Sequence, residues 1–154
     1  MSLPANIQWA RDYALEILGD KKDVTGRPHM IMLDAVAAKM PDDDLACIAY
    51  EQDLAKEAGL TIMKLMMRGG AMRVACAVTR FFPFDDESGD DYLRRVAKDD
   101  LLYPVVLADA KYLKNPANYD PNAENILENA AKYSDIYHKL KKLVILNGKK
   151  PPAN

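Results

Sequence analysis

Two aspartates and one glutamine stand where a helical pattern calls for apolar side chains. In the stretch IAYEQDLAKEAGLT, residues 48–61, apolar residues recur at helical spacing, but Gln52 takes a core-facing position with Asp53 beside it. Asp109 interrupts the apolar face of the segment VVLADAKYL in the same way. Aspartate is rarely buried without a partner, because an uncompensated buried charge is costly. A shared site that gathers both carboxylates would explain the pattern, and carboxylates hold metal ions or transfer protons.

A structural interpretation of the same aspartates stays open. Each can lie at the edge of a groove and bind backbone amides or a base such as Arg27 or Lys111. His29 precedes an apolar helix and can line a cleft, whereas His138 lies among lysines and is expected on the surface. The sequence contains neither a GxSxG motif nor a P-loop, so nucleophilic catalysis and phosphate binding by a glycine loop have no support.

The elements that position these residues are predicted to be helices throughout. No stretch of strand length keeps a period of two, so we expect one all-α domain over residues 1–154. Glycines, prolines and capping residues place the helices at about 4–18, 30–40, 41–58, 61–69, 72–78, 92–96 and 101–113, with a long last helix at 121–147. The helix at 30–40 is apolar nearly all round and is predicted to be the central buried element. The methionine-rich run at 62–67 is predicted to fill the core.

Charge and composition exclude several classes of partner. The net charge is −2 with 29% charged residues of both signs, so we expect no duplex nucleic acid and no anionic membrane surface as a partner. No apolar run approaches the length of a membrane span and the N-terminus lacks a signal-peptide pattern, so we expect a cytoplasmic protein. Cys47 and Cys76 lie among small apolar residues and are expected to stay reduced.

The order of several segments resembles the HD-domain superfamily. These segments are KKDVTGRPH, MIMLDAVA, CIAYEQDLAKEAGLT, AVT, DDYLRRVAKDD and VVLADAKYL. The similarity as a whole covers residues 7–115. They are similar in particular to the hydrolase domain of the guanosine tetraphosphate (ppGpp) synthetase/hydrolases and their small stand-alone relatives. The resemblance implies an all-helical fold and one divalent metal ion, commonly manganese, held between helices.

The metal ligands of the family are only half present. The resemblance carries the first ligand His onto Met32, the His of the His-Asp pair onto Gln52, the Asp of that pair onto Asp53 and the last Asp onto Asp109. A thioether and a neutral amide are poor ligands for hard divalent ions. The metal site is therefore expected to be a remnant, and any ion would be one weakly bound divalent metal such as manganese, with His29 as the substitute ligand.

The expected catalytic positions have changed as well. The acidic pair that handles water in the family falls on Lys56 and Glu57, so half of it is now basic. Lys56 follows Asp53 by three residues and is predicted to replace the metal as the local cation. The resemblance places Lys21, Lys22, Arg27 and His29 in the region that binds nucleotide.

The leading interpretation is a catalytically inactive HD scaffold without a cofactor, because a water without a metal lacks the lowered pKa that phosphate-ester hydrolysis needs. Such a scaffold would keep a nucleotide-binding or regulatory role. The alternative is a weakly metal-dependent ppGpp or nucleotide phosphohydrolase that uses Asp53, Asp109 and His29, with Glu57 as general base. A third alternative is a structural or interaction module that binds a protein partner or a second copy through FFPF, residues 81–84, or through the last helix.

Overall fold

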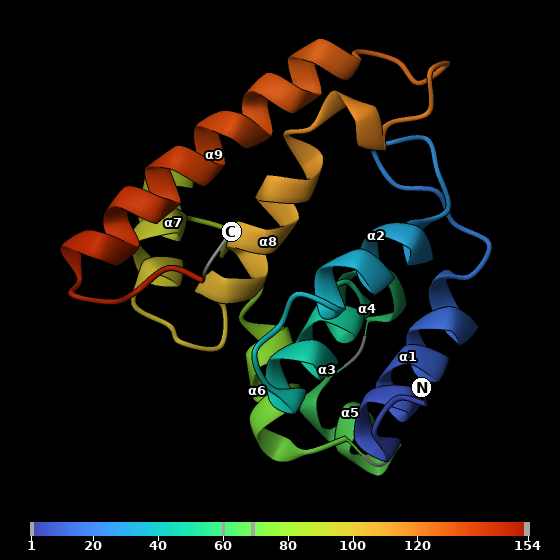
Figure 1. Cartoon of the computed structure of the whole chain (residues 1–154). Coiled ribbons are helices and arrows are strands. Elements are labelled where there is room, and N and C mark those ends of the chain that lie inside the picture. The colour runs from blue at the N-terminus through green and yellow to red at the C-terminus, as the bar shows by residue number, and fades with distance from the viewer. Residues whose placement is uncertain (1, 60, 69, 153–154) are drawn as a thin grey trace. The chain divides into compact units, whose positions relative to one another are not determined.

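The computed structural model describes residues 2–59, 61–68 and 70–152, without the side chains of residues 57 and 58 (Figure 1). Within these ranges the chain is helical and has no strand, which confirms the predicted all-α class. The same residues include no helix long and apolar enough to cross a membrane. The helices are α1 (Ala5–Leu18), α2 (His29–Ala37), α3 (Asp43–Glu51), α4 (Leu54–Ala58), α5 (Ile62–Met67), α6 (Met72–Thr79), α7 (Gly89–Ala97), α8 (Tyr103–Leu113), the 3-10 turn η1 (Pro116–Asn118) and α9 (Ile126–Leu146).

Local signals explain where several helices begin and end. The Asp42 carboxylate accepts a hydrogen bond of 2.9 Å from the Leu45 amide and caps α3. The Thr61 hydroxyl caps α5 and the Ser88 hydroxyl caps α7 in the same way. Asn125 has a left-handed backbone with φ of 54°, so α9 begins at Ile126 rather than at residue 121.

The chain divides into two compact units that we describe separately. Unit 1 consists of residues 1–21 and 28–82, and unit 2 consists of residues 22–27 and 83–154. The sequence-based expectation that residues 1–154 form one domain stays a prediction.

Unit 1 is built around α3, which packs against α1, α2 and α6. Every residue of α3 from Leu45 to Glu51 is buried, so this helix is covered on all sides. The sequence prediction that the helix at 30–40 is the central one is therefore wrong. In α2, Ile31 is 46% exposed, and Asp34 on the same helix binds neighbouring side chains.

Unit 2 is organised by α9, which contacts α7, α8 and η1 (Figure 1). One face of α9 supplies Ala130, Tyr137, Leu140 and Val144 to the interior. These residues lie seven, three and four positions apart, as a single buried face of a helix requires.

The short segment 22–27 completes unit 2 from a distant part of the sequence. The Asp120 amide donates to the Thr25 carbonyl at 2.8 Å, and Arg27 Nη2 donates to the Tyr119 carbonyl at 3.2 Å. Gly26 has a φ of +76°, and a Cβ there would lie 3.2 Å from Cβ of Ala123. Glycine therefore provides both the backbone conformation and the close approach that this contact needs.

A polar cluster joins three helices of unit 1. Arg11 on α1 donates to both carboxylate oxygens of Asp34 on α2, at 2.8 and 3.0 Å, and the Tyr50 hydroxyl on α3 donates to the same group at 2.8 Å. Burial alone would raise the pKa of Asp34, but the hydrogen bonds from Arg11 and Tyr50 outweigh burial and lower it. The cluster thus favours the ionised carboxylate.

Asp34→Asn should lower the free energy of unfolding by about 1 kcal/mol at pH 7, a modest value because solvent screens a carboxylate that is 41% exposed. A lowered folded-state pKa gives stability that is present above the ordinary carboxyl pKa and lost as the pH falls through the folded-state value. The difference between wild type and variant should therefore begin to shrink below the ordinary carboxyl pKa of about 4 and disappear below the lower pKa of the folded state. Urea denaturation at several pH values measures it, with the exposed Asp12→Asn as the matched control.

Candidate functional site

The helix expected to run from residue 41 to residue 58 breaks at the two residues of interest. Helix α3 ends at Glu51, α4 begins at Leu54, and Gln52 and Asp53 form the turn between them. Asp53 has φ of −93° and ψ of −5°, a conformation common in turns and at functional sites. Aspartate is a weak helix former whose side chain competes for backbone hydrogen bonds, so it favours such a position.

Gln52 faces inward, as predicted from the helical spacing. It is 4% exposed, and its Nε2 donates to the Ala49 carbonyl at 3.0 Å. Met32 on α2, the other position that resembles a lost histidine ligand, is 6% exposed and forms part of the core of unit 1. Both side chains therefore fill the interior in the ways that an amide and a thioether ordinarily do.

Asp53 is paired with a histidine. Its Oδ2 lies 2.7 Å from Nε2 of His29, the first residue of α2. The two side chains are only 22% and 16% exposed, so the pair is largely shielded from solvent. The structure thus brings together two of the predicted site residues, one named as a metal ligand and the other as its substitute.

The residue predicted to neutralise Asp53 has a different neighbour. Lys56 on α4 is exposed, and its Nζ lies 5.7 Å from the centre of the Phe82 ring. This is a cation–π distance. The side chain of Glu57, the other predicted catalytic position, lies outside the described part of the structure. The cation beside Asp53 is therefore the imidazole of His29, whenever that ring is protonated.

Asp109 lies in unit 2, on α8, and is partly buried. Its charge reaches Tyr92 on α7, whose pKa is raised to about 12 by burial first and by Asp109 next. The phenol of Tyr92 therefore stays protonated at neutral pH. That Asp53 and Asp109 share one site stays a prediction.

The described side chains of each unit do not reproduce the metal site of the family that the sequence resembles. Within each unit the described residues contain no group of three His, Cys, Asp or Glu side chains that could hold a metal. The donor chemistry points the same way, since Gln52 uses its amide on the backbone and Asp53 has a histidine at 2.7 Å.

The predicted nucleotide-binding residues fall into different surroundings. Lys21 and Lys22 have exposed side chains. Arg27 is partly buried and donates to the Tyr119 carbonyl, so it helps fasten the segment 22–27 within unit 2. Of these three bases, the two lysines are therefore the better candidates for meeting a phosphate group.

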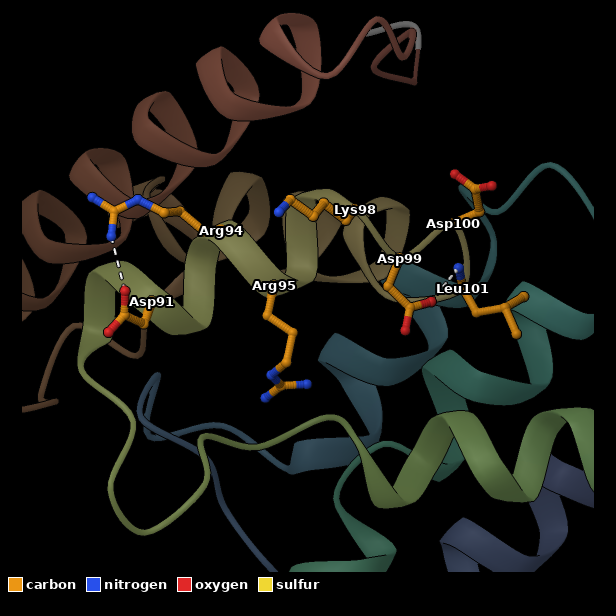
Figure 2. A pocket seen from close by; sticks show the side chains of 7 residues that line it. All are labelled: Asp91, Arg94, Arg95, Lys98, Asp99, Asp100 and Leu101. Atoms are coloured by element: carbon orange, nitrogen blue, oxygen red, sulfur yellow. Dashed lines mark hydrogen bonds and ion pairs between the residues drawn. The ribbon is translucent and has the colours of Figure 1, made fainter.

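A second group of charged residues lines a hollow beside α7 in unit 2 (Figure 2). Figure 2 shows Arg94 bound to Asp91, at 2.9 Å, while Arg95 points away from both. Arg95 binds Glu87 through two hydrogen bonds of 2.8 and 3.0 Å, and Asp100 pairs with Lys149 at 2.6 Å. Because its charges are largely matched within unit 2, this hollow is a poor candidate for a dedicated anion site.

Glu51 is the functional candidate that the sequence reasoning missed. It is 1% exposed, and neither carboxylate oxygen has a hydrogen-bond partner among the described residues. Burial raises the pKa of Glu51 to about 7. A signal was present in the sequence, because Cys47 lies three residues after Asp44 and Glu51 four residues after Cys47, so all three share one helical face.

Two comparisons with known proteins accompany this geometry. No protein-family model matches the chain, and no curated protein matches it either.

Proposed function

We propose that the chain is a degenerate HD-domain protein that has lost metal-dependent phosphohydrolase chemistry and has a nucleotide-binding or regulatory role. The observation that carries the proposal is the contact between His29 and Asp53, at 2.7 Å, next to a buried glutamine where the family has its ligand histidine. With Asp53 paired to His29 and the neutral amide of Gln52 beside it, this position offers weak ligands for a divalent metal ion. Without a metal, a bound water keeps its ordinary high pKa and is a weak nucleophile.

The expected ligand is a nucleotide phosphate that meets Lys21 and Lys22. Both side chains are exposed, and each would supply a point charge to a phosphate oxygen. The third alternative, docking through FFPF, has less support. Phe81 is 4% exposed and therefore belongs to the core. The centre of the Phe84 ring lies 4.1 Å from Cζ of Arg95, so this ring already has a cation–π contact within unit 2.

Metal binding is tested by incubating the purified protein with manganese, removing free ions by gel filtration and measuring metal content by mass spectrometry. We expect well under one manganese ion per chain and no hydrolysis of ppGpp. One ion per chain, with hydrolysis that Asp53→Asn and Asp109→Asn both abolish, would establish the weak enzyme instead.

Nucleotide binding is tested by thermal unfolding with ppGpp, GTP and ATP. A ligand at about ten times its Kd should raise the melting temperature by about 3–5 °C. Replacing Lys21 and Lys22 together by glutamine should remove the shift, whereas replacing Lys141 and Lys142 on α9 should leave it intact. The absence of any shift with all three nucleotides would leave only the structural or interaction role.

A further inference from the structure

Unit 1 contains a recess that the proposed function does not use. It has a volume of about 150 Å³ and lies between α1, α3 and the start of α6. This is more room than a single water molecule needs, and a cavity of about this size can take a six-membered ring. Trp9, Asp44, Cys47 and Glu51 are among the residues that line it.

Glu51 is the most unusual part of this lining. Its side chain is almost completely buried, and both carboxylate oxygens lack a hydrogen-bond donor among the described residues. Asp44, the other carboxylate of the recess, already has a cation, because its Oδ2 lies 2.6 Å from Nη1 of Arg73. Buried polar groups in proteins are nearly always hydrogen-bonded, so an unmatched acceptor that lines a recess indicates a missing donor.

The surroundings favour a positively charged donor. The pKa of the Cys47 thiol is raised to about 12, first by burial and then by the negative charges of Glu51, Asp44 and Asp43. The α3 side of the recess therefore carries two carboxylates, and of the two it is Asp44 that is paired with a cation, Arg73. Trp9 on α1 also lines the recess, and indole rings attract organic cations.

We infer that this recess binds a small organic ammonium ion, with its N–H groups directed to the carboxylate of Glu51 and its carbon skeleton against Trp9. The ammonium would supply both the hydrogen bonds and the charge that Glu51 lacks. A divalent metal fits less well, because the described residues offer no cluster of three metal-binding side chains here. The inference uses residues separate from the His29–Asp53 pair, so it stands or falls independently of the proposed function.

Trp9 makes the test direct, because it is the only tryptophan of the chain. Its fluorescence, excited at 295 nm, is followed while the full-length protein is titrated with benzylammonium, with benzyl alcohol as the neutral analogue and with benzoate as the anionic one. We expect a saturable change with benzylammonium, half-complete at about 1 mM, and at least about tenfold weaker responses to the other two compounds.

Glu51→Gln keeps the shape of the side chain and removes its charge, so it should weaken benzylammonium binding by at least about tenfold. The exposed Glu128→Gln on α9 is the matched control and should bind as the wild type does. Equal responses to the ammonium and the alcohol, no saturable response, or wild-type binding by Glu51→Gln would each overturn the inference. If Glu51→Gln fails to fold, the comparison of the three compounds on the wild type decides alone.

Discussion

Replacing Glu51 by methionine should raise the free energy of unfolding by about 3 kcal/mol at pH 8 but by only about 1 kcal/mol at pH 5. The reason is that burial raises the pKa of Glu51 from 4.5 to about 7. Below about pH 4.5 both the folded and the unfolded chain hold the proton. Between pH 4.5 and 7 only the folded chain holds it, so the stability of the wild type falls as the pH rises and then levels off. Methionine removes this cost because its unbranched side chain has no charge to bury.

Urea denaturation of wild type and Glu51→Met at pH 5, 6, 7 and 8 measures this effect as a difference between the two proteins. Contributions from other titrating groups cancel in that difference. Glu128→Met, at an exposed position of α9, is the control and should change stability by less than about 0.5 kcal/mol at every pH. A difference that does not vary with pH would show that Glu51 is not a buried, unpartnered acid.

Breaking the pair between His29 and Asp53 should have the second largest effect. We expect Asp53→Ala and His29→Ala each to lower the free energy of unfolding by about 2 kcal/mol, because each leaves a shielded polar side chain without its partner. The double variant should lose about 1–2 kcal/mol less stability than the two single losses added together, because the second change removes a group that has already lost its partner.

Lys56→Ala distinguishes this pair from the cation predicted by the sequence. Because the Lys56 ammonium lies over the Phe82 ring and is exposed, its loss should cost less than about 0.5 kcal/mol. Urea denaturation at pH 6 compares all four variants with wild type. If Lys56→Ala lost much stability and His29→Ala lost almost none, Lys56 would be the partner of Asp53 instead.

The fold class and most helix boundaries follow from local chemistry and were predictable. Asp42 and Thr61 cap the helices that they precede, and the spacing of apolar residues predicted the inward position of Gln52. Caps and periodicity depend on residues only a few positions apart, so a sequence states them directly.

Features that depend on packing were missed. The methionine-rich run at 62–67 was predicted to fill the core, but Met63 is 71% and Met67 is 81% exposed, and Leu65 is the buried residue of α5. Periodicity gives the faces of a helix but not how many of them are covered by neighbours. For the same reason Glu51 was not named as a candidate, although every residue of α3 from Leu45 to Glu51 is buried.

The candidate site was predicted in part. His29, Gln52 and Asp53 were all named from the sequence, and the structure pairs two of them. The turn at residues 52 and 53 was not foreseen, because the helical pattern continues through it and only the backbone angles of Asp53 reveal the break. That turn matters because it sets the direction of the carboxylate.

The segment 22–27 has a consequence for how the chain folds. Its Arg27 reaches a carbonyl 92 positions later, so unit 2 is assembled from two distant pieces of sequence. A fragment that begins at Pro83 would lack the strip that binds Tyr119 and Asp120. During synthesis, the segment 22–27 leaves the ribosome long before Tyr119 and Asp120 are made, so its contacts with them form only after most of the chain has been synthesised. Long-range closure of this kind slows folding, so the joining of residues 25 and 120 is expected to be a late step.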